Sequence, residues 1–257
     1  MKHIPRKRFG QNFLTDQAVL HDIIRSIDPK PDEAIVEIGP GLAAMTRLLL
    51  DSVNQLHVVE IDRDLAARLR KGFDPGRLIV HEADALAFDF SSIPVAPGQK
   101  LRVVGNLPYN ISSPLLFHLT KLAPQVQDQH FMLQKEVVER MVAEPGSKAF
   151  GRLSVMLQWR YWMELLFVVP PTAFDPPPRV DSAIVRMIPI AQPLACDEAK
   201  LEQVVAKAFS QRRKVLRNCV AGLLTENQII DAGVDPQARP EAVPLEGFVA
   251  LANCLNV

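Results

Sequence analysis

Short apolar runs alternate with amphipathic segments between Glu33 and Val104, and this alternation constrains the fold more than any other feature of the chain. Four of the runs have the length and composition of buried strands: 34–38, 56–60, 78–80 and 101–104. Helical periodicity separates the first three of them, over 42–51 and 62–71. Strands that alternate with helices need crossover connections, which produce a parallel sheet. The sequence therefore predicts an α/β fold.

The middle of the chain continues this pattern. After the fourth strand, Ser112-Ser113-Pro114 is expected to supply an N-cap followed by Pro at the first position of a helix. One strand is then predicted over 131–133, followed by helices over 135–142 and 152–162.

The pattern changes after residue 168. Segment 170–180 holds five of the 21 prolines, which excludes it as a helix or a central strand. A late strand is expected over 182–188, and helices beyond Pro193. We therefore place one domain boundary near residue 190. It separates a sheet domain, 1–190, from a small all-helical domain, 191–257.

Composition narrows the class of protein. The chain has 257 residues and is 48% hydrophobic, which fits one or two folded domains and excludes wholesale disorder. No apolar run approaches the roughly 20 residues of a membrane span, and no secretory signal is recognisable. The three cysteines (Cys196, Cys219 and Cys254) form no CxxC pair, and the six histidines lack metal-ligand spacing. We expect a cytoplasmic protein without a metal, a disulfide framework or a membrane partner.

Positive charge is concentrated locally although the whole chain is neutral, with 29 Lys and Arg against 29 Asp and Glu. Two clusters contain no acid: Lys2, Arg6, Lys7 and Arg8, then Lys207, Arg212, Arg213, Lys214 and Arg217. The second cluster is predicted to lie on a helix over 211–218. The two clusters have two interpretations. They form a basic face that binds RNA phosphates, or they are solvated surface charges without a partner.

A glycine loop follows the first predicted strand. Gly39 and Gly41 allow a ligand to approach the backbone closely, and the following helix offers free N–H groups. Glu60 ends the second strand, where a carboxylate can accept hydrogen bonds from ribose hydroxyls. Asp84 follows the third strand and is interpreted either as an acceptor for an adenine amine or as a cap. This pattern favours a nucleoside cofactor over a purely structural turn.

The most specific motif is Asn106-Leu107-Pro108-Tyr109, directly after the fourth strand. The Asn106 side-chain oxygen and the Leu107 carbonyl can each accept one N–H of a base's amino group. Pro108 fixes the turn, and Tyr109 offers a ring on which the base can stack. The motif predicts methyl transfer to an exocyclic amine.

Taken together, these stretches resemble the ribosomal RNA adenine N6-dimethyltransferase family. The matching segments are FGQNFL (9–14), VEIGPGLAAMT (36–46), VEID (59–62), ADAL (83–86) and GNLPYNIS (105–112). Segments 130–143, 151–156, 174–187 and 209–218 are similar to the bacterial small-subunit members in particular. The resemblance covers nearly the whole chain.

The resemblance implies S-adenosyl-L-methionine as the methyl donor and S-adenosyl-L-homocysteine as its product. The family's cofactor contacts would fall on Asn12, Leu14, Gly39, Glu60, Asp84 and Asn106. The catalytic positions would be Asn106, Leu107, Pro108 and Tyr109, with Phe174 stacking the target base opposite Tyr109.

The implied fold is a Rossmann-like class I methyltransferase sheet with a small all-helical C-terminal domain. That domain would bind rRNA through Arg212, Arg213, Lys214 and Arg217. The implied substrate is 16S rRNA in the small ribosomal subunit, where two adjacent adenosines near the 3′ end receive two N6 methyls each. The expected oligomeric state is a monomer.

Three other functions are weighed against this one. An NAD-dependent oxidoreductase would use the glycine loop and Glu60 but leaves the motif at 106–109 unexplained. A ribosome-assembly or RNA-binding factor without methylation would not need that motif. A 23S rRNA adenine methyltransferase would share the sheet motifs, whereas segments 174–187 and 209–218 favour the small-subunit enzyme.

Overall fold

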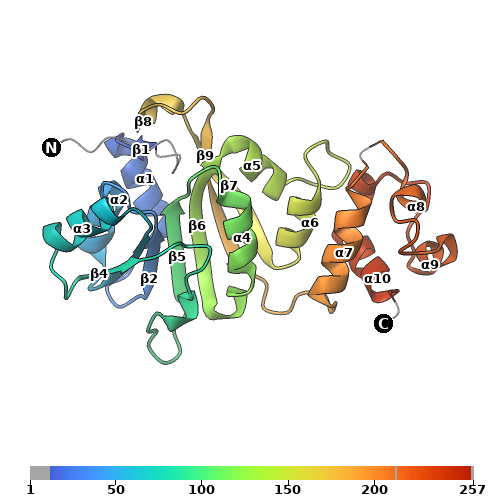
Figure 1. The fold of residues 1–257 in the computed structure, drawn as a ribbon, viewed down its shortest axis with the longest axis horizontal. Helices are drawn as coiled ribbons and strands as arrows, with labels where there is room; N and C mark the ends of the chain where they lie inside the picture. The colour runs from blue at the N-terminus through green and yellow to red at the C-terminus, as the bar shows by residue number, and fades with distance from the viewer. Residues whose placement is uncertain (1–11, 212, 256–257) are drawn as a thin grey trace. The chain divides into compact units, whose positions relative to one another are not determined.

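The computed structural model describes residues 12–211 and 213–255. Within them, seven strands form one sheet in the order β4-β3-β2-β5-β6-β9-β7 (Figure 1). Their bounds, in chain order, are β2 Ile35–Ile38, β3 Leu56–Glu60, β4 Leu78–Glu82, β5 Leu101–Asn106, β6 Val126–Gln134, β7 Tyr161–Val169 and β9 Ser182–Pro189. Strands β2 to β6 pair in parallel, and β9 is antiparallel to β6. The predicted α/β fold with a parallel sheet is confirmed.

Buried strands at the centre of the sheet explain why the sequence shows continuous apolar runs there. Every residue of β2 and β3 is buried, as expected where helices cover both faces of a parallel sheet. The first helices are α1 (Gln17–Ile27), α2 (Ala44–Ser52) and α3 (Arg63–Gly72). They are grouped around the β2–β4 end of the sheet in Figure 1.

Side-chain caps start two of these helices. Asp16 accepts hydrogen bonds from the backbone N–H groups of Ala18 and Val19 at the start of α1. Asp62 accepts one from Asp64 N at the start of α3. The cap at Asp62 matters for the site, because it fixes where the chain turns after β3.

A two-stranded pairing brings the N-terminal segment to the proline-rich segment. Strand β1 (Phe13–Leu14) is antiparallel to β8 (Phe174–Asp175), with Leu14 opposite Phe174. Thr15 N also donates to the Ala173 carbonyl, at 2.8 Å. The proline-rich segment is therefore hydrogen-bonded to the N-terminal segment at Leu14, although the two are about 160 residues apart in sequence.

Residue contacts divide the chain into two units, with three crossings between them. The first unit runs to Val138 and also takes in Glu164–Pro189, and the second comprises Glu139–Met163 and the chain from Ile190 on. The crossing at 189/190 lies where the sequence predicts a boundary. The sequence did not predict that residues 139–163 group with the helical unit. They do so because α6 (Arg152–Gln158) packs on α7 (Glu198–Ala208) and α10 (Leu245–Asn253).

The remaining helices are shorter. They are α4 (Ser112–Thr120) and α5 (Lys135–Met141) in the middle of the chain, with α8 (Leu216–Cys219) and α9 (Glu226–Asp231) between α7 and α10.

Three predicted local features are wrong. The helix expected over 152–162 ends at Gln158, because the β-branched and aromatic run from Tyr161 to Val169 forms strand β7. The helix expected over 211–218 is reduced to α8, since 211–214 offers no apolar side chain to pack against the unit. The N-cap and first-position proline expected at 112–114 are also wrong, because α4 already begins at Ser112 and Pro114 lies inside it; the Ser112 hydroxyl donates to the Pro108 carbonyl at 3.0 Å.

Candidate functional site

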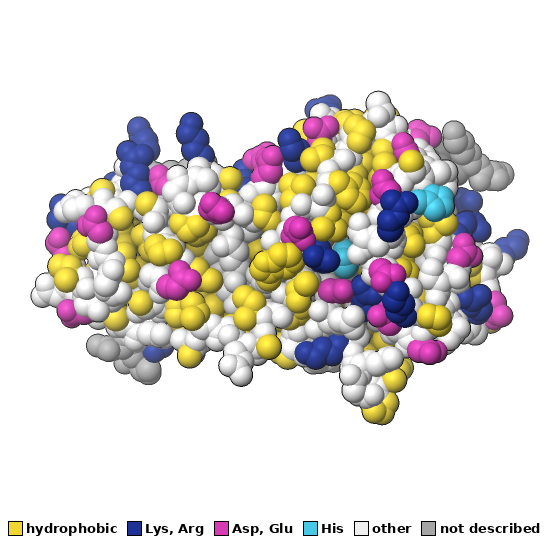
Figure 2. All heavy atoms as spheres, turned by 180° about the vertical axis from the view of Figure 1, so that it is seen from behind, with side chains coloured by type: hydrophobic (Ala, Val, Ile, Leu, Met, Phe, Trp, Pro, Cys, Tyr) yellow, Lys and Arg dark blue, Asp and Glu magenta, His cyan; other side chains and the backbone are white. Residues whose placement is uncertain are grey.

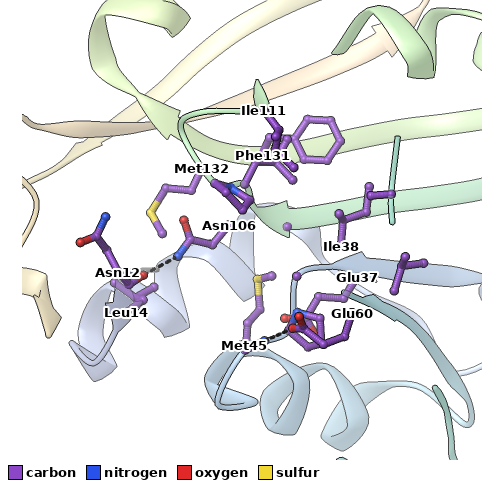
Figure 3. Close-up of a pocket in the computed structure, with 18 of the residues that line it drawn as sticks. Asn12, Leu14, Glu37, Ile38, Met45, Glu60, Asn106, Ile111, Phe131 and Met132 are labelled. Carbon is purple, nitrogen blue, oxygen red and sulfur yellow. Dashed lines mark hydrogen bonds between the residues drawn. The ribbon is translucent and has the colours of Figure 1, made fainter. Parts of the chain in front are cut away.

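A cavity of about 320 Å³ opens at the carboxyl ends of the parallel strands. Ligands bind at this edge in open α/β sheets, because loops and helix N-termini converge there. The ends of β2, β3 and β5 all contribute to its wall, and Figure 3 shows their side chains directed into one space. Ten residues singled out from the sequence line it: Asn12, Leu14, Gly39, Gly41, Glu60, Asp84, Asn106, Leu107, Pro108 and Tyr109.

The glycine loop after β2 uses backbone conformations that glycine favours. Gly39 and Gly41 have φ of 69° and 55°. A Cβ at Gly41 would lie 3.0 Å from the ring of Phe13, so the N-terminal segment packs tightly over this loop. Gly39 N donates to the Val59 carbonyl at 2.9 Å and ties the loop to β3. The loop therefore forms a thin, fixed floor for a ligand.

Glu60 ends β3 as predicted, with its carboxylate inside the cavity wall. Its two oxygens accept hydrogen bonds from backbone groups, Oε2 from Gly41 N at 3.2 Å and Oε1 from Asp62 N at 2.8 Å. Burial raises the pKa of Glu60, and the backbone N–H groups oppose that shift. Each oxygen retains a second lone pair for a hydroxyl of a ligand.

Glu37 is a second carboxyl group in the cavity wall, which the sequence interpretation did not single out. It is 2% exposed and accepts a hydrogen bond from Thr46 Oγ1 at 2.6 Å. Burial raises the pKa of Glu37 to about 8, with a further contribution from the charge of Glu60. The group is therefore protonated at neutral pH, and it is polar without being charged.

The position of Asp84 is compatible with both interpretations that the sequence left open, a ligand acceptor and a cap. It lines the cavity and is exposed, and its Oδ1 also accepts a hydrogen bond from Leu86 N at 3.0 Å. Two apolar side chains of the cavity lining were missed: Leu42, which is 39% exposed, and Ile61, which is 47% exposed. Each directly follows a residue that the sequence did single out, and such exposed apolar surface suits the faces of a planar base.

Asn106 is oriented by the N-terminal segment. Its Nδ2 donates to the Asn12 carbonyl at 3.2 Å, an interaction drawn as a dashed line in Figure 3. Its Oδ1 receives no hydrogen bond from residues 12–211 or 213–255. In this amide orientation, Asn106 Oδ1 is available to accept a hydrogen bond from a ligand, as the predicted contact with an amine requires.

The rest of the motif forms a tight turn after β5. Leu107 is 1% exposed and its N–H donates to the Met132 carbonyl at 3.1 Å, while Ile111 N donates to the Pro108 carbonyl at 3.2 Å. The Tyr109 phenol is hydrogen-bonded to Ser182 Oγ at 2.7 Å. Burial raises the pKa of Tyr109, and its bond to Ser182 partly offsets this.

Phe174 is the exception among the predicted site residues. It is 5% exposed, belongs to the core cluster that also contains Leu14, and is absent from the cavity lining. Its ring is therefore packed in the protein core in this structure. Its connection to the site is indirect, through the pairing of β8 with β1.

The predicted RNA-binding residues lie in the second unit. Arg213 and Lys214 are exposed in a turn, whereas Arg217 Nη1 is paired with Glu226 Oε1 at 3.1 Å. Arg212 and the first basic cluster lie outside the described residues. On the face shown in Figure 2, side chains of both charges are interspersed.

Residues 12–211 and 213–255 hold neither a metal-binding cluster of side chains nor a helix that could span a membrane. No three His, Cys, Asp or Glu side chains there are placed to hold a metal ion. No helix among them has the length and apolar character that a membrane span would need.

Comparison with solved structures defines the class. A dimethyladenosine transferase from Plasmodium falciparum superposes with a TM-score of 0.75 at 25% identity, covering 93% of this chain and 95% of that one. The 23S rRNA methyltransferase ErmE gives 0.73 at 27% identity, covering 95% and 99%. The described residues form a seven-stranded sheet whose cavity is lined by a glycine loop and by the acidic end of a strand. Together with these two matches, this architecture defines the chain as a methyltransferase.

Comparison with sequences defines the family. The model of the ribosomal RNA adenine dimethylase family matches residues 2–256. Relatives named ribosomal RNA small subunit methyltransferase A are 77% identical in Janthinobacterium sp. (strain Marseille) and 76% identical in Herminiimonas arsenicoxydans, each over 99% of this chain and 100% of the relative. The chain belongs to the ribosomal RNA adenine dimethylase family and is an rRNA adenine dimethyltransferase. The resemblance drawn from the short motifs is confirmed.

Proposed function

We propose that this enzyme transfers methyl groups from S-adenosyl-L-methionine to the N6 amines of two adjacent adenosines near the 3′ end of 16S rRNA. Each adenosine would become N6,N6-dimethyladenosine, and the substrate would be the small ribosomal subunit. The high identity to relatives named for the small subunit, over the full length of both chains, supports this choice of substrate. The proposal treats the enzyme as a monomer.

The cavity fits the proposed cofactor in its polar and apolar parts. Glu60 offers two carboxylate oxygens to a pair of ribose hydroxyls, and Asp84 offers an acceptor to the adenine amine. Leu42 and Ile61 supply apolar surface for the adenine faces. Asn12 contributes to the wall beside Asn106, where the methionine part would lie. When bound, S-adenosyl-L-methionine supplies an electrophilic sulfonium methyl group.

The chain's own residues supply the geometry for the amine. Asn106 Oδ1 and the Leu107 carbonyl each accept one N–H, which withdraws the nitrogen lone pair from the ring and directs it at the methyl group. Tyr109 holds the base by stacking, worth about 1–3 kcal/mol. The amine loses its proton after the methyl has been transferred, so the site needs no strong general base.

The target adenosine must leave its stack to enter the cavity. Extrusion costs a few kcal/mol, and less for a base in a loop that is already partly unstacked. Arg213 and Lys214, exposed in the helical unit, are proposed contacts for rRNA phosphates. Arg212 and Arg217 remain proposed contacts, although Arg217 must exchange its bond to Glu226 for the phosphate.

The proposal depends mainly on one observation: Asn106 lies in a cavity of suitable size, and its side-chain oxygen accepts no hydrogen bond from the described residues. Purified protein would be incubated with methyl-labelled S-adenosylmethionine and under-methylated 30S particles, and the rRNA nucleosides identified by mass spectrometry. We expect N6,N6-dimethyladenosine at two adjacent positions, and none with Asn106→Ala. Methylation of 23S rRNA would overturn the substrate, and particle binding without methylation would favour an assembly factor.

A further inference from the structure

The hydroxyl of Ser182 is the hydrogen-bond partner of the Tyr109 phenol. The two oxygens lie 2.7 Å apart and join residues that are 73 positions apart in the chain. Ser182 is fully buried, at 0% exposure, whereas Tyr109 lines the cavity. A buried hydroxyl is costly unless it is hydrogen-bonded, so the bond satisfies Ser182 and fixes one end of the Tyr109 ring.

Ser182 is itself held rigidly by the sheet. It is the first residue of β9 and lies opposite Gln134 of β6. The carbonyl of the preceding residue, Asp181, accepts a hydrogen bond from Lys135 N at 2.9 Å. Tyr109, by contrast, belongs to the turn between β5 and α4. The direction of its ring is therefore set by a hydroxyl at the start of β9, which is separated from β5 by β6 in the sheet.

The two methyl transfers make different demands on this ring. In the first, the amine of adenosine has two N–H groups, one for Asn106 Oδ1 and one for the Leu107 carbonyl. In the second, the monomethylated amine has a single N–H, so one of these two restraints is lost. Stacking on Tyr109 then carries more of the task of holding the nitrogen in line with the methyl group.

We propose that Ser182 is a positioning residue that fixes the Tyr109 ring and thereby determines how completely each adenosine is carried from one methyl group to two. The proposal rests on the proposed function, in which Tyr109 stacks on the target base. Ser182 does not contact the reacting atoms, and it acts through Tyr109.

The test compares single-turnover rates of the first and second transfers on 30S particles for Ser182→Ala, Tyr109→Phe and the double variant. Losing one hydrogen bond should slow the second transfer about two- to tenfold more than the first, so N6-methyladenosine accumulates. Both single variants should show the same product ratio, and the double variant should be no worse than either. The KM for S-adenosylmethionine should stay unchanged.

The matched control is Ser154→Ala, which removes another fully buried serine hydroxyl, one that donates to the Arg140 carbonyl in the second unit. It should keep the wild-type product ratio even if it lowers stability. If Ser182→Ala does not fold, Tyr109→Phe decides the question alone, because it deletes only the phenol oxygen.

A wild-type product ratio in Tyr109→Phe and Ser182→Ala, or additive effects in the double variant, would overturn the proposal. Failure of the wild-type protein to methylate 30S particles at all would instead refute the proposed function, and this inference with it.

Discussion

The buried carboxyl group of Glu37 makes a prediction about stability that is independent of activity. Its pKa is raised to about 8 by burial, from an ordinary value of 4.5. The folded state therefore binds a proton that the unfolded state has released, and the free energy of unfolding falls as pH rises between these two values. One bound proton corresponds to about 1.4 kcal/mol per pH unit, or about 2.7 kcal/mol between about pH 5.5 and 7.5.

Glu37→Gln removes this titration and keeps the shape of the protonated acid. The Gln oxygen can still accept the hydrogen bond from Thr46 Oγ1, and its amide replaces the acid O–H. As pH rises over that range, the free energy of unfolding of Glu37→Gln should increase by about 2.7 kcal/mol relative to that of wild type. At a denaturant slope of about 3 kcal/mol/M, this difference shifts the urea midpoint by about 1 M.

The assay is urea unfolding of both proteins followed by circular dichroism at several pH values. Other titrating groups, Glu60 among them, are present in both proteins and cancel in the difference. Glu202→Gln, a surface carboxylate paired with Arg152, is the control and should follow the wild-type pH dependence. Parallel curves for wild type and Glu37→Gln would refute the reasoning, because Glu37 would then be ionised in the folded protein.

Three further outcomes are expected. Gly105→Ala places a Cβ 2.6 Å from the Ile38 carbonyl oxygen and should lower the free energy of unfolding by about 1–3 kcal/mol in urea. Gly72→Ala, whose Cβ meets no atom within 4 Å, is the control and should be neutral; equal urea midpoints for the two variants would contradict this. Glu60→Gln should weaken S-adenosylmethionine binding about 10- to 100-fold by calorimetry, since one amide cannot accept from both backbone N–H groups and both ribose hydroxyls; an unchanged Kd would count against the ribose contact. Arg213→Ala should reduce the salt slope of rRNA binding by about 0.7–0.9, and an unaltered slope would remove it from the interface.

The sheet and the cavity were predictable from sequence for one physical reason. Buried parallel strands read as continuous apolar runs, and their carboxyl ends meet at a common edge. Residues at or just after the carboxyl end of a strand, such as Gly39, Glu60 and Asn106, therefore converge however far apart they are in the chain. Strand β7 was missed because no glycine or proline separates it from α6, so the predicted helix was extended to residue 162 and no strand was assigned to the rest of the run.

The placement of Phe174 depends on information that local sequence does not carry. Its burial follows from the pairing of β8 with β1, which joins it to Leu14 across about 160 residues. The bond between Tyr109 and Ser182 is likewise a tertiary contact. A small polar residue at the start of the strand over 182–188 was its sole sequence signal. The helix expected over 211–218 failed because charge spacing alone does not stabilise a helix.

The position of β9 between β6 and β7 has a consequence for the order in which the protein becomes active. Strand β7 is synthesised before β9, yet in the sheet it lies beyond it, so it has no neighbour until β9 has emerged from the ribosome. Ile184, part of the cavity wall, and Ser182 also belong to β9. A nascent chain that stops short of residue 182 already carries the glycine loop and the segment from Asn106 to Tyr109, but its cavity is open on one side. A protein that modifies ribosomal RNA is thus incomplete for most of its own translation.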